Sequence, residues 1–517
     1  MSIVTHPSIP DEDICKEIFA RACEKAEFKK VIDSLFAPMN RNRSAICFSS
    51  VLENIKDEAF ILARKTVVSF LEQMDAEFRY STARVNNYYV KQTRPRTIVT
   101  MIGEITYRRT EYIDKHTGAS FIYVDREIGL LPRMRYDNSV AAEAYEQYSN
   151  HNSMIKVGEN LSKEIYGFSM KDDRHTKYIS RQQIFNMINR FKQITASVSR
   201  LSDTPDTIYI MADEKYINLQ QMRKVWMEEQ LSLGFPQAEV MEELKKQHFD
   251  EMVKMGVIFT GREEILNKQG DHLERRRWKL TGKWHISFPN DPSNFWIHTY
   301  DILQKLFDMD KVKNIYILGD GAKWIRAGTN ELRSAQTKCR FALDRYHLSQ
   351  AIHRITKEKD ERELLLNYAK HGMTKEFKYL CEMIISEGRI SEDTIRKQMD
   401  YVLHNITAIK VMKEEVKIGC AMEQAIQHVL ASPFSSVPKA YGRDHLRTYV
   451  NARINQQNGL NMIKLYLTAV DKYIQSSGTC TDSIDLSEED MNWSFFDDQK
   501  PLPYHHVNLP GFDTRAI

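Results

Sequence analysis

The hydrophobic pattern changes its period several times along the chain, and each change marks a different kind of element. In the first 90 residues, apolar positions return every three or four residues, most clearly between Ala59 and Leu71, which is the spacing of an amphipathic helix. Short β-type runs on either side of Gly103 then predict a hairpin with a glycine turn. We therefore expect a helical arm followed by a small β-region.

The segment over residues 137–200 has the pattern of three successive helices. The last has a clear start, because Ser180 is a suitable N-cap and Gln183 can complete a capping box. Ile184, Ile188 and Phe191 then form one apolar stripe. The pattern is typical of a helix-turn-helix that reads DNA, and also of an ordinary solvated amphipathic helix.

Beyond residue 204, apolar strands alternate with helices, which predicts an α/β sheet with mixed strands. Buried strands over 207–213 and 314–320 each end in an aspartate, and a shorter strand ends at Asp344. Between the first two we expect one or two charged helices over 222–255, strands over 256–260 and 278–287, and a helix over 294–308. A long helical stretch runs from 348 to about 430, and helical patterning returns over 444–473.

These patterns divide the chain into seven regions. They are a helical arm (1–90), an arginine-rich β-hairpin region (91–136), a helix-turn-helix-like region (137–200), the first part of an α/β core (204–348), a helical insertion (349–418), the rest of the core (419–475) and a tail (476–517).

Composition excludes several classes of protein. Hydrophobic residues make up 42% and charged residues 28% of the 517, which is ordinary for a soluble globular protein. The seven cysteines are scattered without a C-x-x-C pair, so neither a zinc site nor a disulfide framework is indicated. The sequence has no secretion-signal pattern and no apolar run of about 18 residues. We therefore expect a cytoplasmic protein without a membrane partner.

The formal net charge of +3 does not by itself indicate a nucleic-acid partner, so local distribution must decide. Basic residues gather in the predicted hairpin and on the outer face of the helix after Ser180. A charge cluster is often only a solvated face. The candidate DNA-binding residues are Arg94, Arg96, Arg108, Arg109, Arg181, Gln182, Asn186 and Arg190.

Asp213 and Asp320 are the candidate catalytic acids. Carboxylates at the ends of neighbouring strands converge, and hard cations such as Mg²⁺ prefer oxygen ligands. A pair of such ions about 4 Å apart stabilises the attacking and leaving oxygens of phosphoryl transfer. On its own, an aspartate after a strand is often only a turn former or helix cap. The long helical region offers Glu414, Glu415 and Glu423 as a third acid.

Four segments together resemble a known family. ADEKYINLQ (212–220), YILGDGAKWI (316–325), LDRYH (343–347) and GCAMEQAIQHVLASPFSSVP (419–438) are similar, in order and spacing, to bacterial insertion-sequence transposases of the ISLre-two family. These are DDE enzymes, distantly Mutator-like. The similarity extends from about Arg96 to Gly459, and its G-D-G-A-x-W-I motif is fairly specific.

The resemblance implies an RNase H-like (retroviral integrase-like) core in which Asp213, Asp320 and Glu423 hold two Mg²⁺ or Mn²⁺ ions. The separation of the last two acids far exceeds one crossover helix, which fits the all-helical insertion. The resemblance also implies groups that support the metal ligands or position DNA: Asp344, His347 and His428. A strand-end aspartate and structural histidines are the alternative for these three.

The sequence departs from the family pattern after Glu423. Gln424 stands where the family has glycine, and Pro433 and Val437 stand where it has arginines, so two expected DNA-contacting charges are replaced. We expect this change to alter the DNA contacts or the activity of this chain.

The expected function is that of a nucleoid-associated DNA transposase. It would bind the terminal repeats of its element, cleave there, and join the exposed 3′-hydroxyl to target DNA at the same two-metal site. Pairing of two ends implies a homodimer or higher oligomer. The alternatives are a structure-selective nuclease with the same fold, and a catalytically silent DNA-binding protein derived from a transposase.

Overall fold

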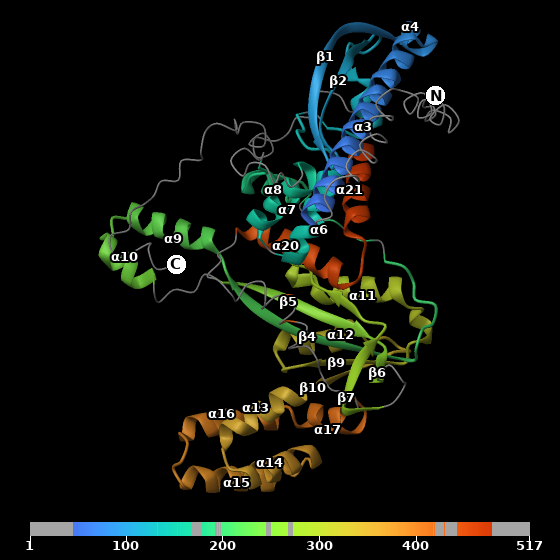
Figure 1. Ribbon diagram of the computed structural model, residues 1–517. Helices are drawn as coiled ribbons and strands as arrows, with labels where there is room; N and C mark the ends of the chain where they lie inside the picture. Colours follow the sequence, from blue (N-terminus) through green and yellow to red (C-terminus); the bar gives the residue numbers. More distant parts are fainter. Residues whose placement is uncertain are drawn as a thin grey trace. The chain divides into compact units, whose positions relative to one another are not determined.

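The computed structural model describes residues 45–131, 133–151, 153–166, 178–191, 194, 196, 198–244, 250–266, 272–416, 418, 426, 429 and 442–477. The chain divides into two compact units. Unit 1 comprises residues 1–144, 154–187 and 467–517, and unit 2 comprises 145–153 and 188–466. Figure 1 shows their elements coloured along the sequence.

In unit 1 a long helix, α3 (Ala45–Tyr80), packs against an antiparallel hairpin of β1 (Tyr88–Thr100) and β2 (Gly103–Asp114). Leu71 and Phe78 of the helix share a core with alternating hairpin residues such as Ile105 and Tyr107. Gly103 has a φ of 108°, which explains the glycine at the turn. The short elements α4 (Thr82–Asn87), β3 (Ser120–Ile122) and α5 (Tyr123–Glu127) complete this part.

Three helices follow: α6 (Asn138–His151), α7 (Met154–Tyr166) and α8 (Arg181–Ile188). The predicted capping box is confirmed, because the Ser180 N–H donates to Gln183 Oε1 at 2.8 Å and the Gln183 N–H donates to Ser180 Oγ at 3.3 Å. A Cβ on Gly158 of α7 would lie 2.3 Å from the carbonyl oxygen of Ile179. Only glycine therefore permits this close approach of the two segments.

Unit 2 contains a five-stranded mixed sheet in the order β10-β9-β4-β5-β8. The strands are β4 (Thr207–Asn218), β5 (Asp250–Phe259), β8 (Trp284–Ile286), β9 (Asn314–Gly319) and β10 (Lys338–Leu343). Along the chain, β4, β5 and β8 form an antiparallel series, whereas β9 and then β10 add in parallel on the other side of β4. The expected α/β sheet with mixed strands is confirmed.

Both faces of this sheet are buried. Ile208, Ile210 and Ala212 of β4 share a core with α11 (Phe295–Leu306) and α12 (Lys323–Glu331). Met211, on the opposite face, belongs to a second core that includes the helices after β10. The period-2 alternation of one strand thus divides its side chains between two cores. Short 3-10 turns at Pro292–Asn294 and Met309–Lys311 flank α11.

The connection between β4 and β5 differs from the prediction. The region over 222–255 contains α9 (Gln220–Ser232) and α10 (Gln237–Leu244), but β5 already begins at Asp250. The charged residues in the first half of β5 conceal the strand in the sequence, because pairing with β4 from Asn218↔Asp250 onward, rather than local pattern, defines it.

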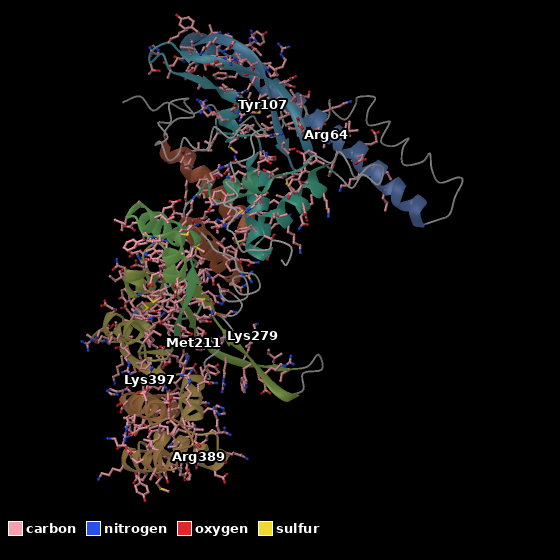
Figure 2. All side chains as sticks on the ribbon, turned by 90° about the vertical axis from the view of Figure 1, so that its left-hand side faces the viewer. Arg64, Tyr107, Met211, Lys279, Arg389 and Lys397 are labelled. Atoms are coloured by element: carbon pink, nitrogen blue, oxygen red, sulfur yellow. The ribbon has the colours of Figure 1, made fainter. Side chains whose placement is uncertain are left out.

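The hairpin of β5 and β8 continues beyond the sheet as an arm of β6 (Gly261–Leu266) and β7 (His272–Thr281), here called the β6–β7 arm. Lys279 lies on this arm, which projects away from the sheet that carries Met211 (Figure 2). At its base the Thr260 N–H donates to Thr281 O at 2.9 Å, and Gly282 adopts a φ of 56°. The sequence pattern did not reveal this arm.

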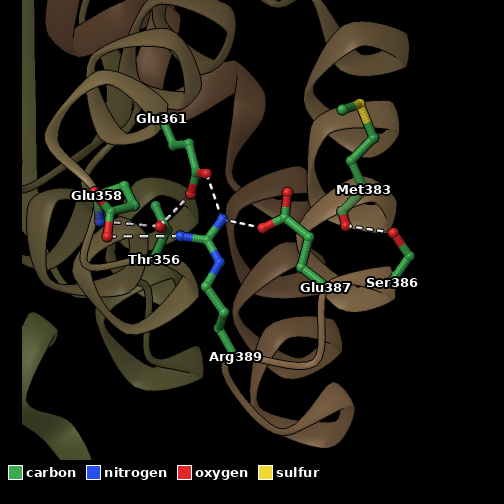
Figure 3. A network of polar contacts seen from close by, with 7 residues as sticks. All are labelled: Thr356, Glu358, Glu361, Met383, Ser386, Glu387 and Arg389. Atoms are coloured by element: carbon green, nitrogen blue, oxygen red, sulfur yellow. Dashed lines mark hydrogen bonds and ion pairs between the residues drawn. The ribbon is translucent and has the colours of Figure 1, made fainter.

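After β10 the chain is helical, as expected: α13 (Arg345–Ile355), α14 (Lys359–His371), α15 (Thr374–Ser386), α16 (Glu392–His404) and α17 (Ile406–Glu414). A polar network joins the turns of this helical insertion (Figure 3). Arg389 lies 2.5 Å from Glu361, 3.6 Å from Glu358 and also contacts Glu387. One guanidinium thus connects the start of α14 to the end of α15.

Two further helices, α20 (Arg443–Gln457) and α21 (Met462–Ser477), follow the segment after α17. Asn458, at the end of α20, accepts from the backbone N–H of His285 at 2.7 Å and donates to its carbonyl oxygen at 3.0 Å. The side chain therefore pairs with the free edge of β8. Within the described residues, none of the helices is both long and apolar enough to span a bilayer.

Candidate active site

Three aspartates occupy matching register positions at three adjacent parallel strands: Asp213 within β4, and Asp320 and Asp344 directly after β9 and β10. Met211 of β4 pairs with Leu318 of β9, so Asp213 and Asp320 each lie two residues further on. Leu343 of β10 pairs with Gly319, and the next N–H, of Asp344, donates to Gly319 O at 2.9 Å. Neighbouring strands are about 4.8 Å apart, so the backbone positions of the three aspartates form a row across the sheet.

Asp213 does not end its strand, which corrects the prediction from the sequence. β4 continues to Asn218 because β5 pairs with it along the whole segment, with Asp213 opposite Met255. Only the parallel pairing with β9 stops at Met211. Asp213 therefore lies within a strand, two residues beyond the point where its pairing with β9 ends.

Burial and like charge raise the free energy of the ionised Asp213 carboxylate. Burial raises its pKa to about 6, with a further contribution from Asp320, while the N–H of Glu214 and the nearby His347 act in the opposite direction. The Glu214 N–H donates to Asp213 Oδ1 at 2.8 Å. A partly buried acid with an acidic neighbour is an arrangement that a bound cation would stabilise.

Asp320 lies in a tight turn between β9 and α12. Its Oδ1 accepts from the N–H of Ala322 at 2.8 Å, which fixes the carboxylate relative to the turn. The next residue, Gly321, has a φ of 94°, a conformation that other residues rarely adopt. The second glycine of the G-D-G-A motif, Gly321, is thus required by the backbone conformation of the turn that contains Asp320.

Asp344 and His347 form a pair beside this turn. Asp344 is only 5% exposed and caps α13 by accepting from the N–H of Tyr346 at 3.1 Å. Its Oδ2 lies 3.2 Å from Nδ1 of His347. This contact raises the pKa of His347, to which Asp320 and Asp213 also contribute. The imidazole therefore lies within the field of all three aspartates.

A further group of neighbouring residues, Glu214, Trp324 and Lys254, lies beside the aspartates and was not predicted from the sequence. Glu214 accepts a hydrogen bond from Trp324 Nε1 at 2.6 Å, and burial together with Asp320 raises its pKa. Lys254, its register partner on β5, lies 5.0 Å from the Trp324 ring. Glu214 and Trp324 both lie in the motifs that contain Asp213 and Asp320. Their closeness to these acids in the sequence could have identified them as part of the site.

The described part of the site offers two neighbouring aspartates and no complete ligand set. Among the residues that the structure describes, no three His, Cys, Asp or Glu side chains come close enough together to hold a metal ion. The predicted third acid, Glu423, lies outside the described residues, as do His428, Gln424, Pro433 and Val437. The oxygen donors of Asp213 and Asp320 fit a hard divalent cation in type.

The candidate DNA-binding arginines of the hairpin differ in exposure. Arg96 and Arg109 both contact Asp125 within unit 1, and Arg96 also donates to two backbone carbonyls. These described contacts are structural. The side chain of Arg94 is 65% exposed, and Arg108 is also exposed. Arg94 and Arg108 are therefore the hairpin pair whose placement leaves them accessible to DNA.

The candidates on the third helix are only partly where the pattern placed them. Arg181 is exposed at the first position of α8, and Gln182 donates to Asn186 at 3.0 Å along the helix. Arg190 lies beyond Ile188, where α8 ends, and so is not on the helix face. The described helix is shorter by one turn than the apolar stripe predicted.

Comparison with known proteins finds relatives that are similar along most of the sequence. Two curated proteins of Caldanaerobacter subterraneus subsp. tengcongensis, both described as UPF0236 proteins, are 25% identical over 418 residues, or 80% of this chain and 79% and 78% of theirs. Another is 24% identical over 441 residues, covering 84% of this chain and 82% of its own length. That bacterium has many paralogues, since the names of two relatives join four and eleven gene designations.

Among solved structures, the Drosophila P element transposase strand transfer complex aligns with 67% of this chain and 82% of its own, with a TM-score of 0.23 and 9% identity. The profile of one protein family matches residues 41–233 and 239–468. With most of its length matched, the chain belongs to the uncharacterised protein family UPF0236.

Proposed function

We propose that this chain is a DNA transposase of the DDE class, which cleaves and joins DNA by metal-dependent phosphoryl transfer. The observation that carries the proposal is the matching register of Asp213 and Asp320, each two residues beyond the last pair, Met211 and Leu318, of two adjacent parallel strands. Glu423 is the proposed third acid, supplied by the segment after the helical insertion. Three carboxylates of this kind are the ligand set of a two-metal phosphoryl-transfer site.

The sheet topology supports an RNase H-like core. Three strands form an antiparallel series, and two more join in parallel beside the first strand. The two aspartates belong to the first strand and to the turn after the first added parallel strand. In open sheets, functional groups gather beyond the carboxyl ends of parallel strands, which is where Asp320 lies, and Asp213 lies where the parallel pairing of β4 with β9 has ended.

The residues of the site have distinct proposed roles. Asp213, Asp320 and Glu423 would hold Mg²⁺ or Mn²⁺, which supplies activation of water and stabilisation of charge on the oxygens of the phosphate. Asp344 orients His347 through its hydrogen bond. The imidazole lies close to the acids, and its proposed role is to contact a scissile phosphate. No protein nucleophile is required.

The gene designations of the relatives also support the proposal. One bacterium contains many paralogues of these proteins. Proliferation within a genome is expected of a gene that directs its own movement. The proposed partners are accordingly double-stranded DNA, in the form of element ends and target, and a second copy of the chain.

The test is cleavage of DNA that carries the sequences flanking the gene. The purified chain is incubated with this duplex and Mg²⁺ or Mn²⁺, and we expect nicks with 3′-hydroxyl ends followed by joined products. Asp320→Asn should abolish both while DNA binding persists. Asp310→Asn, an exposed acid of the same unit, is the matched control and should retain activity. Cleavage that survives Asp320→Asn would overturn the proposal, and nicks without joining would favour the nuclease alternative.

A further inference from the structure

The turn that presents Asp320 is held by the helical insertion. Tyr401, on α16, donates its hydroxyl hydrogen to the backbone oxygen of Asp320 at 2.6 Å. A residue 81 positions along the chain thus binds the main chain of a candidate catalytic acid.

A second residue of the insertion holds the next peptide of the turn. Asn405 is 3% exposed at the junction of α16 and α17, and its Oδ1 accepts a hydrogen bond from Arg326. Arg326 in turn donates through Nε to Gly321 O at 3.1 Å. Asn405 Nδ2 also donates to Tyr401 O at 2.8 Å, so the two insertion residues are coupled.

The fit between the turn and the insertion is close. A Cβ on Gly321 would lie 2.9 Å from Oδ1 of Asn405, nearer than ordinary contacts allow. Two successive carbonyl oxygens, of Asp320 and Gly321, each accept a hydrogen bond. The side chain of Asp320 is bonded to the same turn through Ala322, so the direction of the carboxylate follows the position of these peptides.

We propose that Tyr401 and Asn405 are positioning residues that set the orientation of Asp320 for cation binding. The helical insertion then has a role in the active site besides any contact with DNA. The inference rests on the proposed function, because it assumes that Asp320 is a metal ligand. Groups that orient ligands from outside typically change metal affinity or activity by about 10- to 100-fold when removed.

The first test is Tyr401→Phe in the full chain, which removes one hydroxyl and keeps the ring. Binding of Mn²⁺ is measured by electron paramagnetic resonance without DNA, so the readout is independent of catalysis. We expect an affinity about tenfold weaker than that of the wild type. Tyr379→Phe removes a hydroxyl from a 70% exposed tyrosine of α15 and should bind Mn²⁺ like the wild type.

A second pair of variants separates positioning from folding. Asn405→Asp keeps the acceptor for Arg326 but loses the donor to Tyr401 O, so it should weaken Mn²⁺ binding less than Asn405→Ala, which removes both. Thermal denaturation in EDTA identifies any variant that loses binding by unfolding. With DNA, the rate of Tyr401→Phe should recover at saturating Mn²⁺, because the ligands themselves are intact.

The outcomes distinguish the two proposals. If the wild type binds Mn²⁺ and cleaves DNA but Tyr401→Phe has the same affinity, the positioning role is wrong and the proposed function stands. If the wild type binds no Mn²⁺, the proposed function and this inference both fail.

Discussion

The carboxylate of Asp213 is repelled by that of Asp320, its neighbour across the β4–β9 pair, and this repulsion adds to the effect of burial on its pKa. Both effects make ionised Asp213 unfavourable in the folded protein. The arrangement therefore reduces stability when no cation is bound, as expected where acids are placed for chemistry rather than for folding.

Asp213→Asn should stabilise the chain while abolishing cleavage. The pKa of Asp213 rises from 3.8 to about 6 on folding, so at pH 7 the ionised carboxylate lowers the free energy of unfolding. The shift corresponds to about 3 kcal/mol, which partial exposure reduces to about 1–2 kcal/mol. Urea denaturation in EDTA measures the gain, with Asp310→Asn as control. Unchanged or lower stability of the variant would contradict this account of the acids.

Acidification should destabilise unit 2 through His285. Burial, followed by the charge of Lys283, lowers the pKa of this imidazole from 6.5 to about 4. As the pH falls, His285 therefore takes up a proton in the unfolded chain before it does so in the folded protein. Its contribution to the free energy of unfolding is complete above pH 6.5 and is lost as the pH falls towards 4. The shift corresponds to about 3 kcal/mol. His285→Gln should lose less stability over this window in urea titrations; identical pH profiles of variant and wild type would exclude this origin.

The β6–β7 arm should contact DNA backbone. Arg277 and Lys279 are exposed on β7, next to Trp278, which is 45% exposed. Replacing both cations by alanine should weaken DNA binding and reduce the slope of log K against log salt by about 2, because each phosphate contact contributes about 0.9. Fluorescence anisotropy over a salt series measures the slope. Lys305→Ala with Lys311→Ala is the control pair, and equal slopes for both pairs would remove the arm from the DNA interface.

The hairpin arginines should separate into structural and DNA-binding groups. Asp125→Ala leaves Arg96 and Arg109 without their shared carboxylate and should lower the free energy of unfolding by about 3–5 kcal/mol. Arg94→Ala should change stability by less than about 0.5 kcal/mol and weaken DNA binding instead. Denaturation and anisotropy on both variants test this division, which an Arg94 variant with wild-type DNA affinity would refute.

The local sequence pattern was sufficient to predict the strands that lead to Asp213 and Asp320. After Asn314, the strand before Asp320 consists of buried, mainly apolar residues, and such a run can be recognised without its neighbours. The same holds for the start of β4, and the capping box at Ser180 depends only on residues three apart.

Pairing across the sheet could not be inferred from local pattern. The extension of β4 beyond Asp213 depends on β5, whose charged first half has no strand signal. The bond between Tyr401 and Asp320 joins residues that only the packing of the insertion brings together. Arg96 was misjudged for the same reason. Its basic neighbours in the sequence indicate an exposed surface, but in the structure Asp125 and backbone carbonyls enclose its side chain.

The amide of Asn458 has a consequence for how copies of this chain can associate. By occupying the N–H and C=O of His285, it covers the open edge of β8 much as one residue of another strand would. At the other edge, β10 presents the charged side chains of Lys338 and Arg340. Both margins of the sheet therefore oppose continuation into a neighbouring molecule. This five-stranded sheet is therefore a poor surface for joining two copies of the chain by strand addition.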